Sequence, residues 1–184
     1  MKILILSLSA NPDSLSRRAA LEFQRMLTSE KVESELIDIR SLPPVWVDGR
    51  DLEDYPKEYG KLNKAVTTAS GVAIFMPIYC YTVSSPAKTI SEVIGDAFTR
   101  KPVAFITSAG SLRSHLAVRD LMASMSFEQE TICFPKVAQI TSQDFSSVKK
   151  LRRPAKNRLS VMATEFPAFV RAVAGFIKSY PGSS

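Results

Sequence analysis

Short, nearly continuous apolar runs alternate along this chain with segments whose apolar residues recur at helical spacing. The runs predict strands over residues 3–8, 32–39, 72–76, 102–107 and 132–140. Continuous apolar runs are typical of parallel strands that are covered on both faces. Right-handed crossovers between such strands place the connecting helices on both sides of the sheet. The alternation therefore predicts an α/β three-layer sandwich: a five-stranded parallel sheet with helices on both faces.

The segments between the predicted strands show the apolar period of amphipathic helices. Helices are expected over residues 19–27, 59–69, 85–94, 116–125 and 154–179. Pro167 is expected to kink or split the last of them. The 184 residues suit one domain, and no internal repeat or linker interrupts them. We therefore expect a single domain over residues 1–184, with a helical extension from about residue 146.

Cysteine and histidine are too scarce for a disulfide framework or a transition-metal site. The chain has only Cys80, Cys133 and one histidine, His115. The apolar residues at the start of the sequence are followed at once by a polar loop, and no cleavage signal separates the two. They therefore predict a strand rather than a signal peptide. No uninterrupted apolar run approaches the ~20 residues of a membrane span. We expect a cytoplasmic protein with no metal and no membrane contact.

The net charge of +6 indicates an acidic partner, and much of the excess lies in residues 149–158. Phosphate-bearing nucleotides and nucleic acid both meet that description. No aromatic residues are interleaved with the basic ones, as they are on single-strand binding surfaces. The charge pattern therefore favours a nucleotide over nucleic acid.

The loop after the first predicted strand, residues 7–18, is rich in serine and contains no glycine. In parallel sheets of this kind, ligands bind beyond the carboxyl ends of the strands. The missing glycines exclude the dinucleotide fingerprint and the Walker loop. Hydroxyl groups and a helix N-terminus can still hold a single phosphate, with Ser9, Asn11, Ser14, Ser16 and Arg17 as candidate donors. The alternative is that Ser14 or Ser16 only caps the helix.

Two further loops at the same predicted edge contain residues that suit the binding of a flat ligand. Tyr79 and Tyr81 follow the third strand, and small residues around Gly110 follow the fourth. Aromatic rings can pack on a planar ligand, and small residues let it approach the backbone. The alternatives are tyrosines that only pack against the protein and a simple strand-to-helix turn. Together the three loops suit a mononucleotide with a flat ring, and FMN fits that description.

Three stretches, SLSANPDSLSR, MPIYCYTVSSPAK and ITSAGSLRSHLAV, resemble those of the NAD(P)H-dependent FMN reductases, which have a flavodoxin-like fold. The resemblance implies that the first loop holds the FMN phosphate, the second lines the isoalloxazine ring and the third closes over its other edge. Carried over by position, it implicates Ser9, Asn11, Ser14, Ser16, Pro77, Ile78, Tyr79, Ser108, Ala109 and Gly110. The first loop has Asn11 where the family usually has arginine, and Arg17 is expected to supply the missing charge.

The resemblance also implies a reaction. Hydride passes from NADPH or NADH to FMN and then to a small acceptor such as a flavin, a quinone or an azo dye, in a homodimer or homotetramer. Arg113 or Arg17 is a candidate contact for the phosphate of the nicotinamide nucleotide. A phosphorelay receiver is excluded because no acidic residues end the first and third strands. A one-electron flavodoxin carrier fits poorly, since such carriers are typically acidic. A flavin-free module whose basic segment contacts nucleic acid or a partner protein remains an alternative.

Overall fold

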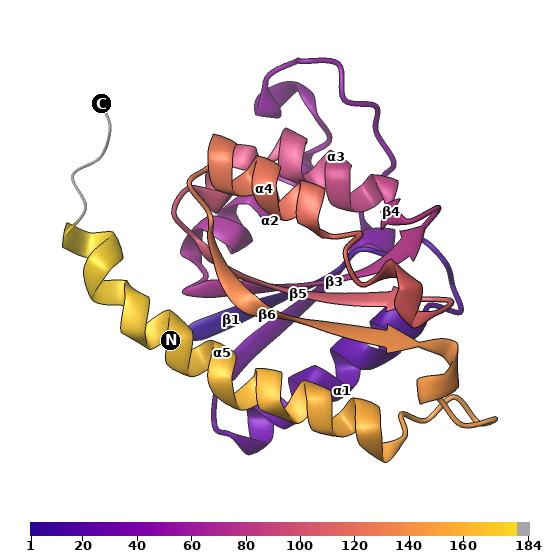
Figure 1. The fold of residues 1–184 in the computed structure, drawn as a ribbon. Coiled ribbons are helices and arrows are strands. Elements are labelled where there is room, and N and C mark those ends of the chain that lie inside the picture. The colour runs from indigo at the N-terminus through magenta and orange to yellow at the C-terminus, as the bar shows by residue number, and fades with distance from the viewer. Residues whose placement is uncertain (180–184) are drawn as a thin grey trace.

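A parallel sheet forms the centre of the computed structural model, which describes residues 1–179 (Figure 1). Its five parallel strands are β1 (Lys2–Ser7), β2 (Glu33–Asp38), β3 (Gly71–Tyr79), β5 (Pro102–Ala109) and β6 (Ile132–Thr141). They lie in the order β2-β1-β3-β5-β6. Counted over parallel strands alone, this is the flavodoxin-like order, in which the strand sequence reverses beside β1. The predicted fold class is confirmed.

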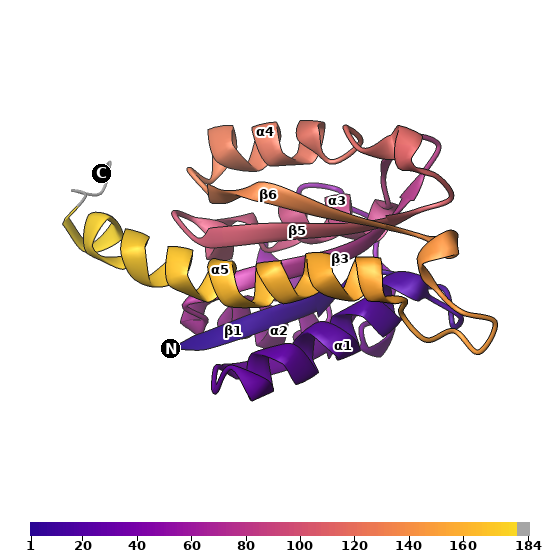
Figure 2. The ribbon, with the colours of Figure 1, turned by 60° about the horizontal axis from the view of Figure 1, so that its bottom comes forward.

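Helices cover both faces of this sheet. They are α1 (Leu15–Ser29), α2 (Lys57–Thr68), α3 (Ser85–Val93), α4 (Arg119–Glu128) and α5 (Arg153–Ser179). Figures 1 and 2 show α1 and α5 on one face and α2, α3 and α4 on the other. Short 3-10 turns lie at Ile39–Ser41, Leu52–Asp54, Gly95–Phe98, Leu112–Ser114 and Ser142–Asp144.

The continuous apolar character of β1 follows from its central position. Ile3 and Ile5 belong to the core on the α1 and α5 side, whereas Leu4 and Leu6 belong to the core on the other side. All four side chains are fully buried. Side chains alternate between the faces of a strand, so a strand with a core on each side has no polar face. Each such residue stabilises the fold by about 1.5–3 kcal/mol.

The third strand is longer than the sequence pattern predicts. It continues past Met76 to Tyr79 and then turns back into β4 (Thr82–Val83). The pairs Ile78–Val83 and Tyr79–Thr82 are antiparallel, which adds a short hairpin to the parallel sheet. The prediction ended the strand at Met76. Pro77 is nevertheless paired by position with Ser108 of β5.

The last helix differs from its prediction in two ways. It runs unbroken through Pro167, which is buried with Phe166 and Val170 against the sheet, so of the predicted kink or split the split is wrong. By length and composition it is also apolar enough to cross a membrane, with a mean hydropathy of 1.3 over an 18-residue window of which 28% is buried. Packing against the sheet explains the buried part, and the last turns extend beyond it (Figures 1 and 2). Residues 180–184 of the predicted extension lie outside the described residues.

The contact between β3 and α5 predicts opposite effects for two glycine substitutions. A Cβ at Gly71 would lie 2.7 Å from Val170 Cγ2 and 3.3 Å from the carbonyl oxygen of Pro102, whereas at Gly60 in α2 it would meet nothing within 4 Å. We expect Gly71→Ala to lower the free energy of unfolding by about 1–3 kcal/mol through overpacking. Gly60→Ala should raise it by about 0.5–1 kcal/mol through helix propensity. Urea denaturation measures both, and a shift of the two variants in the same direction would contradict this packing.

Candidate functional site

The loops that follow β1, β3 and β5 meet around one cavity of about 270 Å³. Nine of its lining residues are expected from the sequence. Ser9, Asn11 and Ser14 follow β1, Pro77, Ile78 and Tyr79 end β3, and Ser108, Ala109 and Gly110 stand at the end of β5 and directly after it. The strands run parallel, so their carboxyl ends lie at the same edge of the sheet. Segments about a hundred residues apart in the chain are thereby brought to one place.

The first loop reaches α1 through a chain of short-range hydrogen bonds. The backbone N–H of Asp13 donates to Asn11 Oδ1 at 2.8 Å, and that of Ser14 donates to the carbonyl oxygen of Asn11 at 3.1 Å. Ser14 is the N-cap, because its Oγ accepts from the backbone N–H of Arg17 at 3.1 Å. The capping role weighed above is therefore present, yet Ser14 and Leu15 also line the cavity. The positive end of the α1 dipole thus faces the cavity, which favours an anion there.

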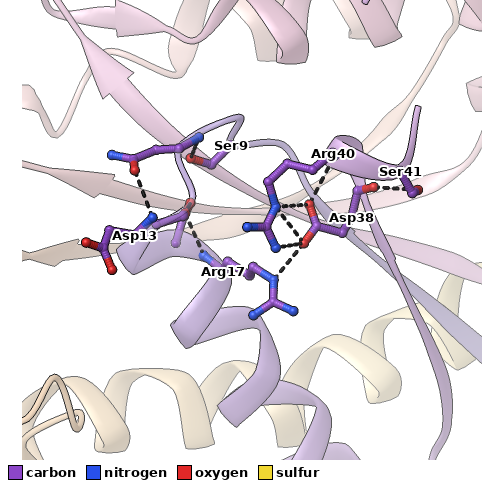
Figure 3. A network of polar contacts seen from close by, with 9 residues as sticks. Ser9, Asp13, Arg17, Asp38, Arg40 and Ser41 are labelled. Atoms are coloured by element: carbon purple, nitrogen blue, oxygen red, sulfur yellow. Dashed lines mark hydrogen bonds and ion pairs between the residues drawn. The ribbon is translucent and has the colours of Figure 1, made fainter. Parts of the chain in front are cut away.

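Two residues expected from the first loop do not line the cavity. Ser16 is buried, and its Oγ lies 2.9 Å from Ser14 Oγ, so it can act on the site only through Ser14. Arg17 Nε donates to Asp38 Oδ2 at 2.6 Å, at the end of β2. Arg40 pairs with the same carboxylate at 2.6 Å (Figure 3). The guanidinium of Arg17 is therefore engaged outside the cavity.

Asp38 holds these two arginines as an ionised carboxylate. Its burial opposes ionisation, but the hydrogen bonds from Arg40 and Arg17 outweigh burial and lower its pKa below the ordinary value. Its side chain is 16% exposed, so solvent screens the interaction only in part.

The second loop is a tight hairpin that projects its aromatic side chains from the sheet edge. Tyr79 and Tyr81 are 53% and 68% exposed, and Tyr79 lines the cavity whereas Tyr81 does not. Cys80 and Tyr81 form the two-residue turn with φ of 50° and 61°. Turns of this kind favour asparagine and glycine, because other side chains are strained at positive φ. The hairpin therefore carries backbone strain beside the cavity.

The third loop leaves open space. Ser108 and Ala109 end β5, and a Cβ placed on Gly110 would meet no atom within 4 Å. Gly110 does not use the left-handed backbone that its sequence context allowed, since Gly49 is the one glycine of residues 1–179 with positive φ. The lack of a side chain at Gly110 thus matters for space rather than for the turn.

Three lining residues were missed by sequence reasoning: Asp13, Leu15 and Ser142. Asp13 lies between residues that were chosen as phosphate donors, and a carboxylate is not a donor. Ser142 begins the turn after β6, so it belongs to the same sheet edge as the other loops. The position of β6 beside β5 was the signal that could have indicated it.

Larger cavities lie elsewhere on the molecule. One of about 430 Å³ is lined by residues of α3 and α4 such as Lys88, Glu92 and Glu128. Another of about 500 Å³ lies between α1 and residues 145–156. Neither is lined by residues of all three loops: the first receives only Lys88 and the second only Arg18 from them. Convergence of these loops, rather than size, marks the smaller cavity as the candidate site.

One family of known proteins matches most of this chain. A model of the family described as NADPH-dependent FMN reductase matches residues 1–145, which include all three loops. No curated protein matches the chain.

Solved structures of similar fold include several flavin proteins. An NADH:FMN oxidoreductase (EMOB) in its apo form has a TM-score of 0.77 and 16% identity, with 91% of this chain and 89% of that chain covered. The flavoenzyme NAD(P)H:(acceptor) oxidoreductase FerB from Paracoccus denitrificans has a TM-score of 0.75 and 17% identity, with 93% and 97% covered. A flavodoxin from the domain Archaea has a TM-score of 0.65 and 14% identity, with 93% and 99% covered. At these identities the likeness concerns the fold.

The strained hairpin predicts a stabilising double substitution. Replacing Cys80 by Asn and Tyr81 by Gly supplies the residues that positive φ favours, so the free energy of unfolding should rise by about 1 kcal/mol. Lys31→Gly is a matched control, because Lys31 has a φ of 57° after α1 and lies far from the cavity in the chain. Urea denaturation compares the three proteins. A stabilised Lys31→Gly beside an unchanged hairpin variant would show that the hairpin is not strained.

Asp38 predicts a pH dependence of stability. A carboxylate whose pKa is lowered by folding stabilises the protein above the unfolded-state pKa of about 3.9, and this is lost as the pH falls through the folded-state pKa. We expect Asp38→Asn to lower the free energy of unfolding by about 1–2 kcal/mol at pH 7. The variant should also lose less stability than the wild type between about pH 5 and pH 2. Parallel pH profiles from urea denaturation would contradict this assignment.

Proposed function

This chain belongs to the NADPH-dependent FMN reductase family, and we propose that it binds FMN in the cavity at the carboxyl edge of the sheet. Members of this family are flavin-dependent oxidoreductases, so the chain is an enzyme of that class. The observation that supports the location is the convergence of three loops, each chosen from sequence, on one cavity at the start of α1. The family match favours this function over a flavin-free binding module.

The residues around the cavity fit the parts of FMN. Ser9, Asn11 and Ser14 supply hydroxyl and amide groups near the α1 N-terminus, where a phosphate is favoured. We assign Pro77, Ile78 and Tyr79 to one edge of the flavin ring, and Ser108, Ala109 and Gly110 to the other edge. No side-chain atom stands over Gly110, so a flat ring has room to approach the backbone. Ser16 acts through Ser14, and Tyr81 lies outside the cavity on the same hairpin.

The cavity is small for a whole FMN molecule, and this suits a reaction in which a second molecule has to reach the flavin. Its volume of about 270 Å³ is just below the ~300 Å³ at which ligand pockets begin, so part of the ligand remains exposed. Bound FMN supplies the hydride-accepting chemistry. The protein's own residues bind the phosphate, orient the ring between two loops and leave one side open to a second molecule. No acid–base pair is required of them.

We assign the donor as NADPH or NADH and the final acceptor as a small molecule such as a free flavin or a quinone. The exposed Arg113, in the turn after β5, is available to the phosphate of the nucleotide donor. Tyr79 and Tyr81 are exposed and form a surface on which a second copy of the chain or the donor can pack. We propose a homodimer or homotetramer, as the family resemblance implies, and a cytoplasmic location, as the scarcity of cysteine suggests.

The experiment is to add FMN to the purified chain, record the absorbance spectrum, and follow NADPH and NADH oxidation. Gly110→Leu should weaken FMN affinity by about tenfold or more because its side chain fills the open space. Gly110→Ala is the control and should stay within about threefold of the wild type. Both variants should unfold at the same urea concentration as the wild type, since a Cβ there meets nothing.

Loss of flavin binding in Gly110→Leu alone would support the proposal. A wild-type protein that neither binds FMN nor oxidises NADPH or NADH in its presence would refute it. Oxidation that required a separate reductase would instead indicate a one-electron carrier.

A further inference from the structure

The charge of the cavity does not match a phosphate. Asp13 is the one acidic or basic side chain among the described residues that line it, and it is negative. A phosphate monoester carries about −1.5 to −2 charges at pH 7, so a neighbouring carboxylate repels it. Arg17, the cation that the sequence offers in this loop, is held by Asp38. Figure 3 shows Asp13 on the other side of the start of α1 from Asp38. A phosphate at this end of the cavity therefore needs a cation from elsewhere.

Lys149 provides a cation beside this position, although it does not itself line the cavity. Its Nζ donates to Asp13 Oδ1 at 2.8 Å, although the two residues are 136 positions apart in the chain. Arg18 Nη2 lies 3.6 Å from the same oxygen. The hydrogen bond from Lys149 is the main reason that the pKa of Asp13 is lowered. The basic segment 149–158, which the sequence could not assign to a role, thus contacts the first loop of the cavity.

The turn that carries Lys149 is anchored rather than loose. Phe145 and Leu151 form an antiparallel bridge, and Phe145 is 6% exposed. Within the turn, the backbone N–H of Ser146 donates to the carbonyl oxygen of Lys150 at 2.8 Å, and that of Lys149 donates to the carbonyl oxygen of Ser146 at 2.8 Å. The turn follows directly from the end of β6, where Ser142 lines the cavity. Its anchoring holds Lys149 beside the first loop.

The surroundings of Lys149 are strongly basic. The neighbouring cavity of about 500 Å³ has one acidic lining residue, Glu22, against five basic ones: Arg18, Arg25, Lys149, Lys150 and Lys156. Glu22 is itself paired with Arg25 and Lys156, at 3.0 Å each. The excess of positive charge attracts anions toward this end of α1.

We propose that Lys149, tethered by Asp13, is the cation that faces the phosphate of the bound flavin, and that the 145–151 turn makes the site select FMN over riboflavin. This inference rests on the proposed function, since it names a residue that recognises the phosphate of that ligand. The charge-assisted contact to the phosphate then comes from a turn that is distant in sequence, and not from Arg17 of the first loop. The tether also neutralises Asp13, which would otherwise oppose the phosphate.

The test measures dissociation constants for FMN and for riboflavin by quenching of flavin fluorescence, with the full chain. Lys149→Ala should weaken FMN binding by about fivefold and leave riboflavin binding within about twofold. Lys149→Arg should retain FMN affinity. Lys150→Ala is the matched control, because it removes one positive charge from the same turn, and it should stay within about twofold for both flavins. The salt dependence of FMN affinity should also be smaller in Lys149→Ala than in the wild type.

Three results would overturn the inference while leaving FMN binding intact. These are an unchanged FMN affinity in Lys149→Ala, an equal loss for FMN and riboflavin, and an equal loss in Lys150→Ala. A wild-type chain that binds neither flavin would instead overturn the proposed function, and this inference with it.

Discussion

Burial of the sheet on both faces is the constraint on which the rest of the structure depends. β1 lies between β2 and β3 with no exposed face, since Ile3 and Ile5 meet one core while Leu4 and Leu6 meet the other. Helices on both sides require crossover connections, and crossovers make the strands parallel. Parallel strands end at the same edge, which is why residues 9, 79 and 110 share one cavity. The position of the candidate site is therefore a consequence of the core.

Competition among charged side chains then shapes what this edge can bind. Asp38 draws Arg17 and Arg40 to the end of β2, whereas Asp13 draws Lys149 and Arg18 to the other side of α1. Arg17, next to the first loop in sequence, is thus engaged away from the cavity, and the distant Lys149 is brought to Asp13, which lines it. The basic character of the chain acts at one end of α1, where an anion is already favoured by the helix dipole.

Several features of the site were predictable because they depend on local order along the chain. Ser14 and Gly110 follow strand signals directly, so their placement at the sheet edge needed only the correct strand positions. The hairpin at Cys80 and Tyr81 was not predictable, since neither residue is among those that favour positive φ. The partner of Arg17 was also inaccessible, because Asp38 is 21 residues away and belongs to a different strand. Pro167 predicted a kink or a split, and α5 is not split there because it packs against the sheet.

The sequence by itself determined the α/β class, the five parallel strands and the loops of the candidate site, because hydrophobic periodicity and strand–helix alternation are local properties. Only the tertiary structure decided which charges reach the cavity. A side-chain ion pair forms only when two groups come within a few ångströms of each other, and their separation along the chain does not predict this. Lys149 and Asp13 meet only because the turn after β6 packs beside α1. The pattern of apolar residues places the edge of the sheet, and the packed fold brings Lys149 to Asp13 at the start of α1.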